Sequence, residues 1–78
     1  MFFAVKTITV IRVYGKGRYD EVYGVYCDPS DGVSKVVKFS GENEFVIADT
    51  LRKVGIDALI GSSLSRTDFS KSYVYEGF

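Results

Sequence analysis

The sequence predicts a small α+β domain in which a three-stranded antiparallel β-meander precedes one amphipathic helix and an irregular tail with a short C-terminal strand. Three observations lead to this prediction. The first half of the chain holds three runs rich in β-branched and aromatic residues, and turn sequences separate them. The period of the apolar residues then changes from two to three or four. Because the 78 residues contain no linker or repeat, we expect a single domain over residues 1–78.

The three predicted strands span residues 5–14, 18–27 and 33–39. The Gly-Lys-Gly sequence at 15–17 has the flexibility that a hairpin turn requires. The Asp-Pro-Ser-Asp-Gly sequence at 28–32 favours a second tight turn, because Pro presets φ, Asp can cap its own turn and Gly accepts a positive φ. Short connections of this kind predict an antiparallel meander.

The predicted helix spans residues 43–54. Ser40 or Asn43 can act as its N-cap, and Glu42 and Glu44 lie where the helix dipole favours negative charge. The apolar face is formed by residues four and three positions apart, namely Ile47, Leu51 and Val54.

The end of this helix is also marked in the sequence. Gly55 stands where a residue with positive φ ends many helices, and Ile56 is placed to contact Leu51 in a Schellman motif. Asp49 and Lys53 are four positions apart, which suits an ion pair on the helix surface. Start and stop signals therefore agree.

The tail after the helix is harder to interpret. Residues 57–60 form a short apolar run that fits either a strand or a buried turn, and periodicity does not decide between them. Residues 61–72 hold five serines and little periodicity, so we expect a loop. Residues 72–76 predict a final short strand at a sheet edge.

Apolar residues fall on both faces of the predicted strands. In the first strand, Ile8 and Val10 share one face while Ile11 and Val13 share the other. One helix covers only one face of a small sheet, so something else must cover the second. A second copy of the protein or a different partner is one option. The other is the chain's own tail, through Leu64, Phe69, Tyr73 and Tyr75.

The composition leaves little room for catalysis or for a metal. Without a histidine the chain cannot form a Ser-His or Cys-His pair, and one cysteine cannot build a zinc or iron site. Neither carboxylate pair, Asp20 with Glu21 or Glu42 with Glu44, has the spacing that places both groups on one face. We therefore expect no enzyme, no catalytic residue, no cofactor and no metal.

The single cysteine also bears on the compartment. Cys27 cannot form an intrachain disulfide, which is unusual for a small secreted domain, so we expect a cytoplasmic protein. Its expected role is that of a small buried residue at a strand end. The apolar start of the chain is interrupted by Lys6 and Arg12, so we expect neither a signal peptide nor a membrane span.

The first functional hypothesis is a small protein-binding module of the inhibitor or adaptor type that acts by steric occupation, as a homodimer or on a different partner. Its support is the small core, the two-sided apolar strands and the tyrosine content. Short, neutral chains of this kind are common among accessory proteins of phages and mobile elements. The predicted contact residues are aromatic, namely Tyr14, Tyr19, Tyr23, Tyr26, Tyr73, Tyr75 and Phe78.

The alternative hypothesis is single-stranded nucleic-acid binding on the sheet, with tyrosines that stack on bases and basic residues that follow the phosphates. Ten basic and ten acidic residues, which give a net charge of zero, argue against it. The basic residues that this hypothesis requires are Arg12, Lys16, Arg18, Lys35 and Lys38.

Overall fold

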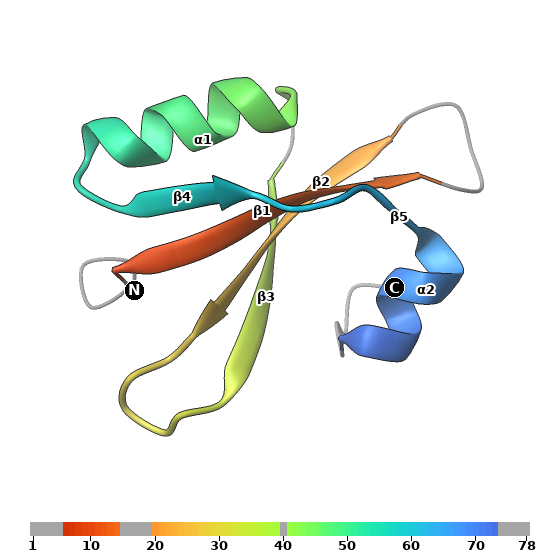
Figure 1. Ribbon diagram of the computed structural model, residues 1–78, viewed down its shortest axis with the longest axis horizontal. Coiled ribbons are helices and arrows are strands. Elements are labelled where there is room, and N and C mark those ends of the chain that lie inside the picture. Colours follow the sequence, from red (N-terminus) through yellow and green to blue (C-terminus); the bar gives the residue numbers. More distant parts are fainter. Residues whose placement is uncertain (1–5, 15–19, 40, 74–78) are drawn as a thin grey trace.

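The predicted α+β fold is confirmed by a computed structural model, which describes residues 6–14, 20–39 and 41–73 (Figure 1). The meander and the helix after it occur where the sequence predicts them, with bounds that differ by up to three residues. The elements in chain order are β1 (Thr7–Tyr14), β2 (Glu21–Cys27), β3 (Ser34–Phe39), α1 (Glu44–Lys53), β4 (Asp57–Ile60), β5 (Leu64–Ser65) and α2 (Arg66–Ser72).

The sheet has the strand order β3-β2-β1-β4, and β5 continues beside β1 beyond β4. β2 is antiparallel to both of its neighbours, whereas β4 and β5 are parallel to β1. In the register, Val10 lies opposite Gly24, which lies opposite Val37. Residues 57–60, for which the sequence left a strand and a turn open, form a parallel edge strand. This pairing follows because α1 crosses over from β3 to the far side of β1.

The start of α1 follows its sequence signals. The Asn43 side chain accepts a hydrogen bond of 2.9 Å from the Val46 N–H, so Asn43 is the N-cap. Ser40, the other predicted cap, lies outside the described residues. The predicted surface ion pair is present, with 3.4 Å between Lys53 Nζ and Asp49 Oδ2.

The end of α1 is the predicted Schellman motif. The Gly55 N–H donates to the Arg52 carbonyl at 3.1 Å, and the Ile56 N–H donates to the Leu51 carbonyl at 3.0 Å. Gly55 has a φ of 92°, a conformation in which a Cβ would be strained. The turn directs the chain back along α1 into β4 (Figure 1).

The predicted loop at residues 61–72 is wrong, because most of it forms β5 and α2. Ser65 is the N-cap of α2 and accepts a hydrogen bond of 3.1 Å from the Asp68 N–H. The helix has seven residues and buries only Phe69, which is too little apolar repetition to give a helical period. The predicted strand at 72–76 begins with a residue of α2, and its part from 74 onward lies outside the described residues.

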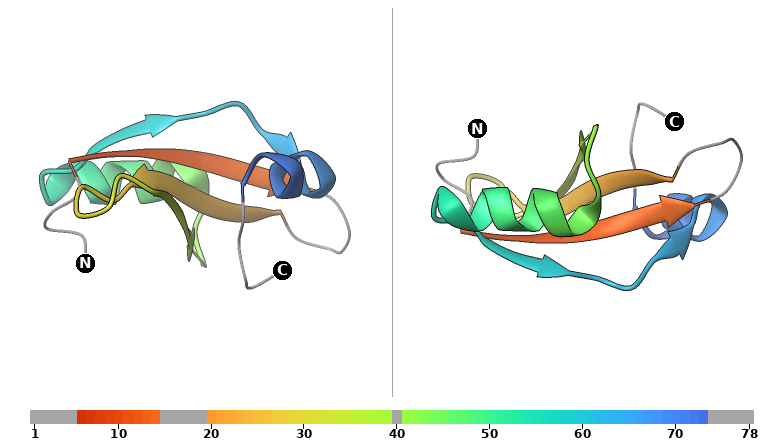
Figure 2. Two further views of the ribbon diagram at one scale, coloured as in Figure 1. Left: turned by 90° about the horizontal axis from the view of Figure 1, so that it is seen from below. Right: turned by 90° about the horizontal axis from the view of Figure 1, so that it is seen from above.

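The two helices pack on opposite faces of the sheet (Figure 2). α1 covers the face formed by alternate residues of β1 such as Ile8 and Val10. The core on this side is completed by β2, β4 and the turn after α1. Its buried members are Ile8, Val10, Val22, Ile47, Ala48, Leu51, Ile56 and Ala58.

The second face is covered by α2, which confirms the tail as its cover for that part of the sheet. Phe69 is fully buried against Ile11, Val13 and Tyr23. Leu64 and Tyr73 also pack there but are only partly buried, and Tyr75 lies outside the described residues. The apolar residues on both faces of β1 are therefore explained within one chain.

Gly24 in β2 is a close-packing position. A Cβ built on it would lie 2.6 Å from Cδ1 of Ile8 and 2.7 Å from Cε2 of Phe39. These two large side chains from the neighbouring strands meet above the glycine, on the face that α1 covers. A glycine in the middle of a strand is ordinarily unfavourable, and here it makes room for the core.

Candidate functional site

Tyr23, predicted as a contact residue, belongs to the core. Its side chain is 2 % exposed, and its ring centroid lies 4.9 Å from that of Phe69. Its hydroxyl donates a hydrogen bond of 2.7 Å to Oε2 of Glu21, which satisfies the only polar group of the side chain. The prediction that Tyr23 contacts a partner is therefore wrong, because Tyr23 lies on the face that α2 covers.

The other predicted aromatic contacts do not form one patch. Tyr14, at the end of β1, is 48 % exposed. Tyr26 is partly buried on the α1 side of the sheet, whereas Tyr73 is partly buried on the α2 side, with its ring 5.0 Å from that of Phe69. The remaining three lie outside the described residues, namely Tyr19, Tyr75 and Phe78.

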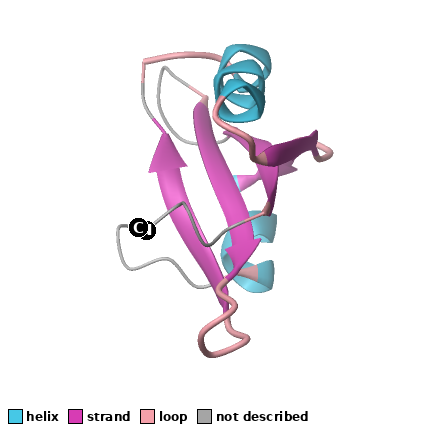
Figure 3. Cartoon of the chain, turned by 90° about the vertical axis from the view of Figure 1, so that its left-hand side faces the viewer, coloured by secondary structure: helices cyan, strands magenta, loops and turns pink. Residues whose placement is uncertain are grey.

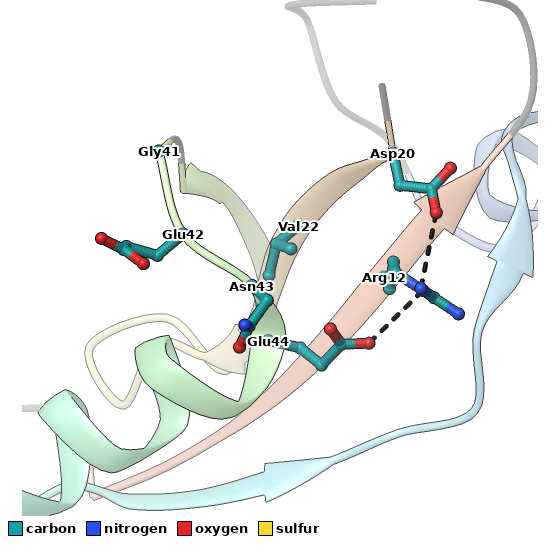
Figure 4. A pocket seen from close by; sticks show the side chains of 7 residues that line it. All are labelled: Arg12, Asp20, Val22, Gly41, Glu42, Asn43 and Glu44. Carbon is teal, nitrogen blue, oxygen red and sulfur yellow. Dashed lines mark ion pairs between the residues drawn. The ribbon is translucent and has the colours of Figure 1, made fainter. Parts of the chain in front are cut away.

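Arg12 lies in a pocket of about 480 Å³ at the start of α1 (Figure 4). Its guanidinium lies 3.5 Å from Asp20 Oδ2 and 3.4 Å from Glu44 Oε2, and the Glu44 side chain is 10 % exposed. In Figure 4 the carboxylates of Asp20, just before β2, and of Glu44, at the start of α1, approach Arg12 from two sides, while Glu42 points away. The charge of Arg12 is thus already compensated inside the fold. The residues lining the pocket are Arg12, Asp20, Val22, Gly41, Glu42, Asn43 and Glu44.

Lys35 is held by the turn that joins β2 and β3. Its Nζ lies 2.7 Å from Asp28 Oδ2 and 3.2 Å from Asp31 Oδ2. The hydrogen bond from Lys35, with a further one from Ser30, holds the pKa of Asp28 well below its usual range. The same bond to Asp28 raises the pKa of Lys35. Hydrogen bonds from the backbone of Ser30 to Asp28 and of Val33 to Asp31 confirm that this acidic sequence is a turn.

Lys38 is held in a similar way, on the opposite face of β3. Its Nζ lies 3.0 Å from Glu21 Oε2 on the neighbouring strand β2. Hydrogen bonds from Tyr23 and then from Lys38 lower the pKa of Glu21. As predicted, Glu21 and the adjacent Asp20 diverge, since Asp20 pairs with Arg12 on the α1 side.

The basic residues of the nucleic-acid hypothesis are therefore not assembled on one surface. Arg12 and Lys35 lie on the α1 side of the sheet and Lys38 on the other, as the strand register requires. Each of the three is paired with a carboxylate. Lys16 and Arg18 lie outside the described residues.

The outer edge of β3 is open among the described residues. The Asp28 N–H donates to the Val33 carbonyl, which fixes the alternation of hydrogen-bonded pairs along the hairpin. Lys35, Val37 and Phe39 accordingly direct their backbone groups toward β2. Three residues direct theirs away from the sheet, namely Ser34, Val36 and Lys38.

The opposite edge of the sheet, at β4, is partly blocked. The N–H group of Asp57 donates to the carbonyl of Lys6, just before β1, and that of Gly61 donates to the carbonyl of Val10 in β1. The backbone of Ala58 therefore points outward. Arg52 of α1 reaches over this edge and donates two hydrogen bonds, of 3.0 and 2.7 Å, to the Ala58 carbonyl. A side chain that caps an edge carbonyl hinders the addition of another strand there.

Apolar side chains flank the open edge on both faces. On the α2 side Val25 and Val36 are partly buried, and on the α1 side Val37 and Phe39 are partly buried. The β2–β3 hairpin extends beyond both helices (Figure 1). This strip, formed by the outer edge of β3 and these four side chains, is here called the β3 margin.

Cys27 ends β2 at this margin and is exposed, so its prediction as a buried residue is wrong. Among the residues that the structure describes, no element covers the thiol.

The sequence hypotheses named aromatic and basic residues but missed the β3 margin. The available signal was a third strand with apolar residues on both faces, together with lysines spaced so that carboxylates of the turn or of the neighbouring strand can reach them. Within the described residues, no group of three or more potential metal ligands comes together, and no helix is long and apolar enough to cross a membrane.

Comparison with known protein families, with curated proteins and with solved structures finds no match.

Proposed function

We propose that the protein is a non-enzymatic protein-binding module, of the inhibitor or adaptor type, whose partner adds a β-strand along the outer edge of β3. The observation that carries the proposal is the contrast between the two edges of the sheet. Arg52 caps the β4 edge, whereas the described residues leave the outward backbone groups of Ser34, Val36 and Lys38 open. Unpaired strand edges are templates for an added strand.

The lysines of β3 support this proposal. A lysine on an edge strand ordinarily discourages edge pairing because a second strand must desolvate its charge. Here Lys38 is drawn inward over β2 by Glu21, and Lys35 is drawn to Asp28 and Asp31 at the turn. Their charges are compensated before any partner arrives, so the edge keeps its capacity to pair.

The margin also has the composition that strand addition uses. Main-chain hydrogen bonds give such complexes their affinity, and alternate side chains give them specificity. An added strand would extend both apolar faces, with Val36 on one side and Val37 and Phe39 on the other. We place this module in the cytoplasm, where the exposed thiol of Cys27 would remain reduced.

A selection from a displayed library of random peptides tests the proposal on sparsely immobilised protein. We expect the wild type to enrich peptides with alternating apolar residues, and Val36→Pro to lose them. Proline removes the outward N–H of Val36, which β2 does not use, so the fold should persist. Ile60→Pro is the matched control on the β4 edge and should retain the peptides. Far-UV circular dichroism with a thermal scan checks that both variants fold.

Peptides that bind Val36→Pro as tightly as the wild type would contradict strand addition at β3. The same protein is titrated with a 20-nucleotide oligo-dT. Saturable binding to this probe without any enriched peptide would replace the proposal with the nucleic-acid hypothesis.

A further inference from the structure

We infer that the strand added to β3 is β3 of a second copy of this chain, in antiparallel orientation, with a two-fold axis at Val36. This inference rests on the proposed function, because it names the partner for the same edge. The two β3 strands would join the five-stranded sheets of the two copies into one continuous sheet. Such an interface is isologous, so the same residues must complement themselves.

The register follows from the direction of the backbone groups. In β3, the N–H and C=O groups that point away from β2 belong to three residues, namely Ser34, Val36 and Lys38. An antiparallel pairing that uses all of them places Val36 opposite the partner's Val36 and Ser34 opposite the partner's Lys38. Every outward backbone group of β3 then has a hydrogen-bonding partner.

The side chains fit this register. Val36 meets the partner's Val36, a β-branched pair on the α2 side, and Lys35 lies opposite the partner's Val37 on the α1 side. Each Lys38 faces a serine, so no lysine lies directly opposite a lysine. A shift of two residues in one direction would place Lys35 opposite the partner's Lys35. The same shift in the other direction would break the valine pair and place each Val36 opposite the partner's Lys38.

The compensated lysines make this self-pairing electrostatically acceptable. Two copies bring four β3 lysines to one seam, which would repel if each carried an uncompensated charge. The carboxylates within 2.7 to 3.2 Å of Lys35 Nζ and Lys38 Nζ belong to the same chain and accompany each lysine into the interface. The Coulomb repulsion across the seam is thereby reduced.

The helices leave room for the second copy. α1 packs mainly on β4 and β1, and α2 on β5 and β1, so both lie toward the other edge of the sheet. In Figure 3, where the β2–β3 turn is at the bottom, both helices lie to the right of the hairpin strands. An interface of one strand is at the small end for protein complexes, so we expect dissociation in the micromolar range or weaker.

Disulfide trapping tests the inference. In a Cys27→Ser background, Val36→Cys places the two thiols across the two-fold axis, where paired Cα atoms are about 5.5 Å apart. Val33→Cys is the matched control at an exposed valine three residues away, where the two Cα atoms would be roughly 20 Å apart. Both variants are first checked for folding by circular dichroism.

With oxidised glutathione at micromolar protein concentration, we expect Val36→Cys to form a covalent dimer at least tenfold faster than Val33→Cys. Equal rates, or no dimer from Val36→Cys, would overturn the inference. Light scattering of the wild type, which carries neither substitution, provides the second measurement: a rise toward twice 8.7 kDa supports the inference. A wild-type monomer at all concentrations that still binds peptides sensitive to Val36→Pro would overturn self-pairing and leave the proposed function standing. A monomer without such peptides would overturn both.

Discussion

Replacement of Phe69 by leucine tests whether α2 covers the second face of the sheet. Phe69 is 0 % exposed, and its ring lies 4.9 Å from Tyr23 and 5.0 Å from Tyr73. A swap between large apolar residues in a packed core costs up to about 1.5 kcal/mol, and the lost ring pairing adds about 0.5–1.5 kcal/mol. We therefore expect Phe69→Leu to lower the free energy of unfolding by about 2 kcal/mol.

That loss is large for a chain of this size. At about 0.05–0.15 kcal/mol per residue, the whole domain has about 4–12 kcal/mol of stability. With about 4–8 °C per kcal/mol, the melting temperature should fall by about 8–16 °C. The same substitution at Phe45, which is 66 % exposed in α1, should change stability by less than about 0.5 kcal/mol.

The assay is urea unfolding followed by far-UV circular dichroism, supported by a thermal scan. Equal effects of Phe69→Leu and Phe45→Leu would refute the placement of α2 on the sheet. The second apolar face would then need another cover.

Three further predictions concern close packing, the helix end and acid. Gly24→Ala should lower the free energy of unfolding by about 1–2 kcal/mol, because its Cβ would overlap Ile8 and Phe39; an unchanged urea midpoint would argue against this packing. Gly55→Val should cost more than about 1 kcal/mol at its φ of 92°, although no atom obstructs the new side chain. The Asp28 contribution to stability should be present above the ordinary Asp pKa and lost as the pH falls through the lowered pKa. Asp28→Asn should therefore lose less stability than the wild type between about pH 5 and pH 2, and equal losses would contradict this.

The meander and α1 could be predicted because their signals are local. A tight turn such as residues 28–32 and a C-terminal glycine such as Gly55 act through neighbouring residues, so the sequence alone identifies them. Asn43 as N-cap belongs to the same class.

α2 and β5 could not be predicted, because they depend on tertiary packing. Phe69 is one apolar residue in a serine-rich segment, and its burial depends on an apolar surface that β1 and β2 provide. The same limit applied to Tyr23, which alternation placed on a strand face without deciding whether a helix covers it.

The β3 margin depends on contacts between elements that lie still further apart in the sequence. Which edge of the sheet stays open is decided by β4, which joins β1 after the crossover and receives the Arg52 cap. From the sequence alone, the lysines of β3 are predicted to be exposed charges. Only the fold brings the carboxylates of Glu21 and Asp28 close to them.

The most direct test of the open β3 edge is the solution mass by light scattering after size exclusion, measured over a concentration series for the wild type and for Val36→Pro. The ratio of absorbance at 260 and 280 nm is recorded on the same peaks. We expect the wild-type mass to rise toward twice the chain mass of 8.7 kDa without nucleic acid, and Val36→Pro to remain a folded monomer. A wild-type monomer that carries nucleic acid and releases it at high salt would contradict the account.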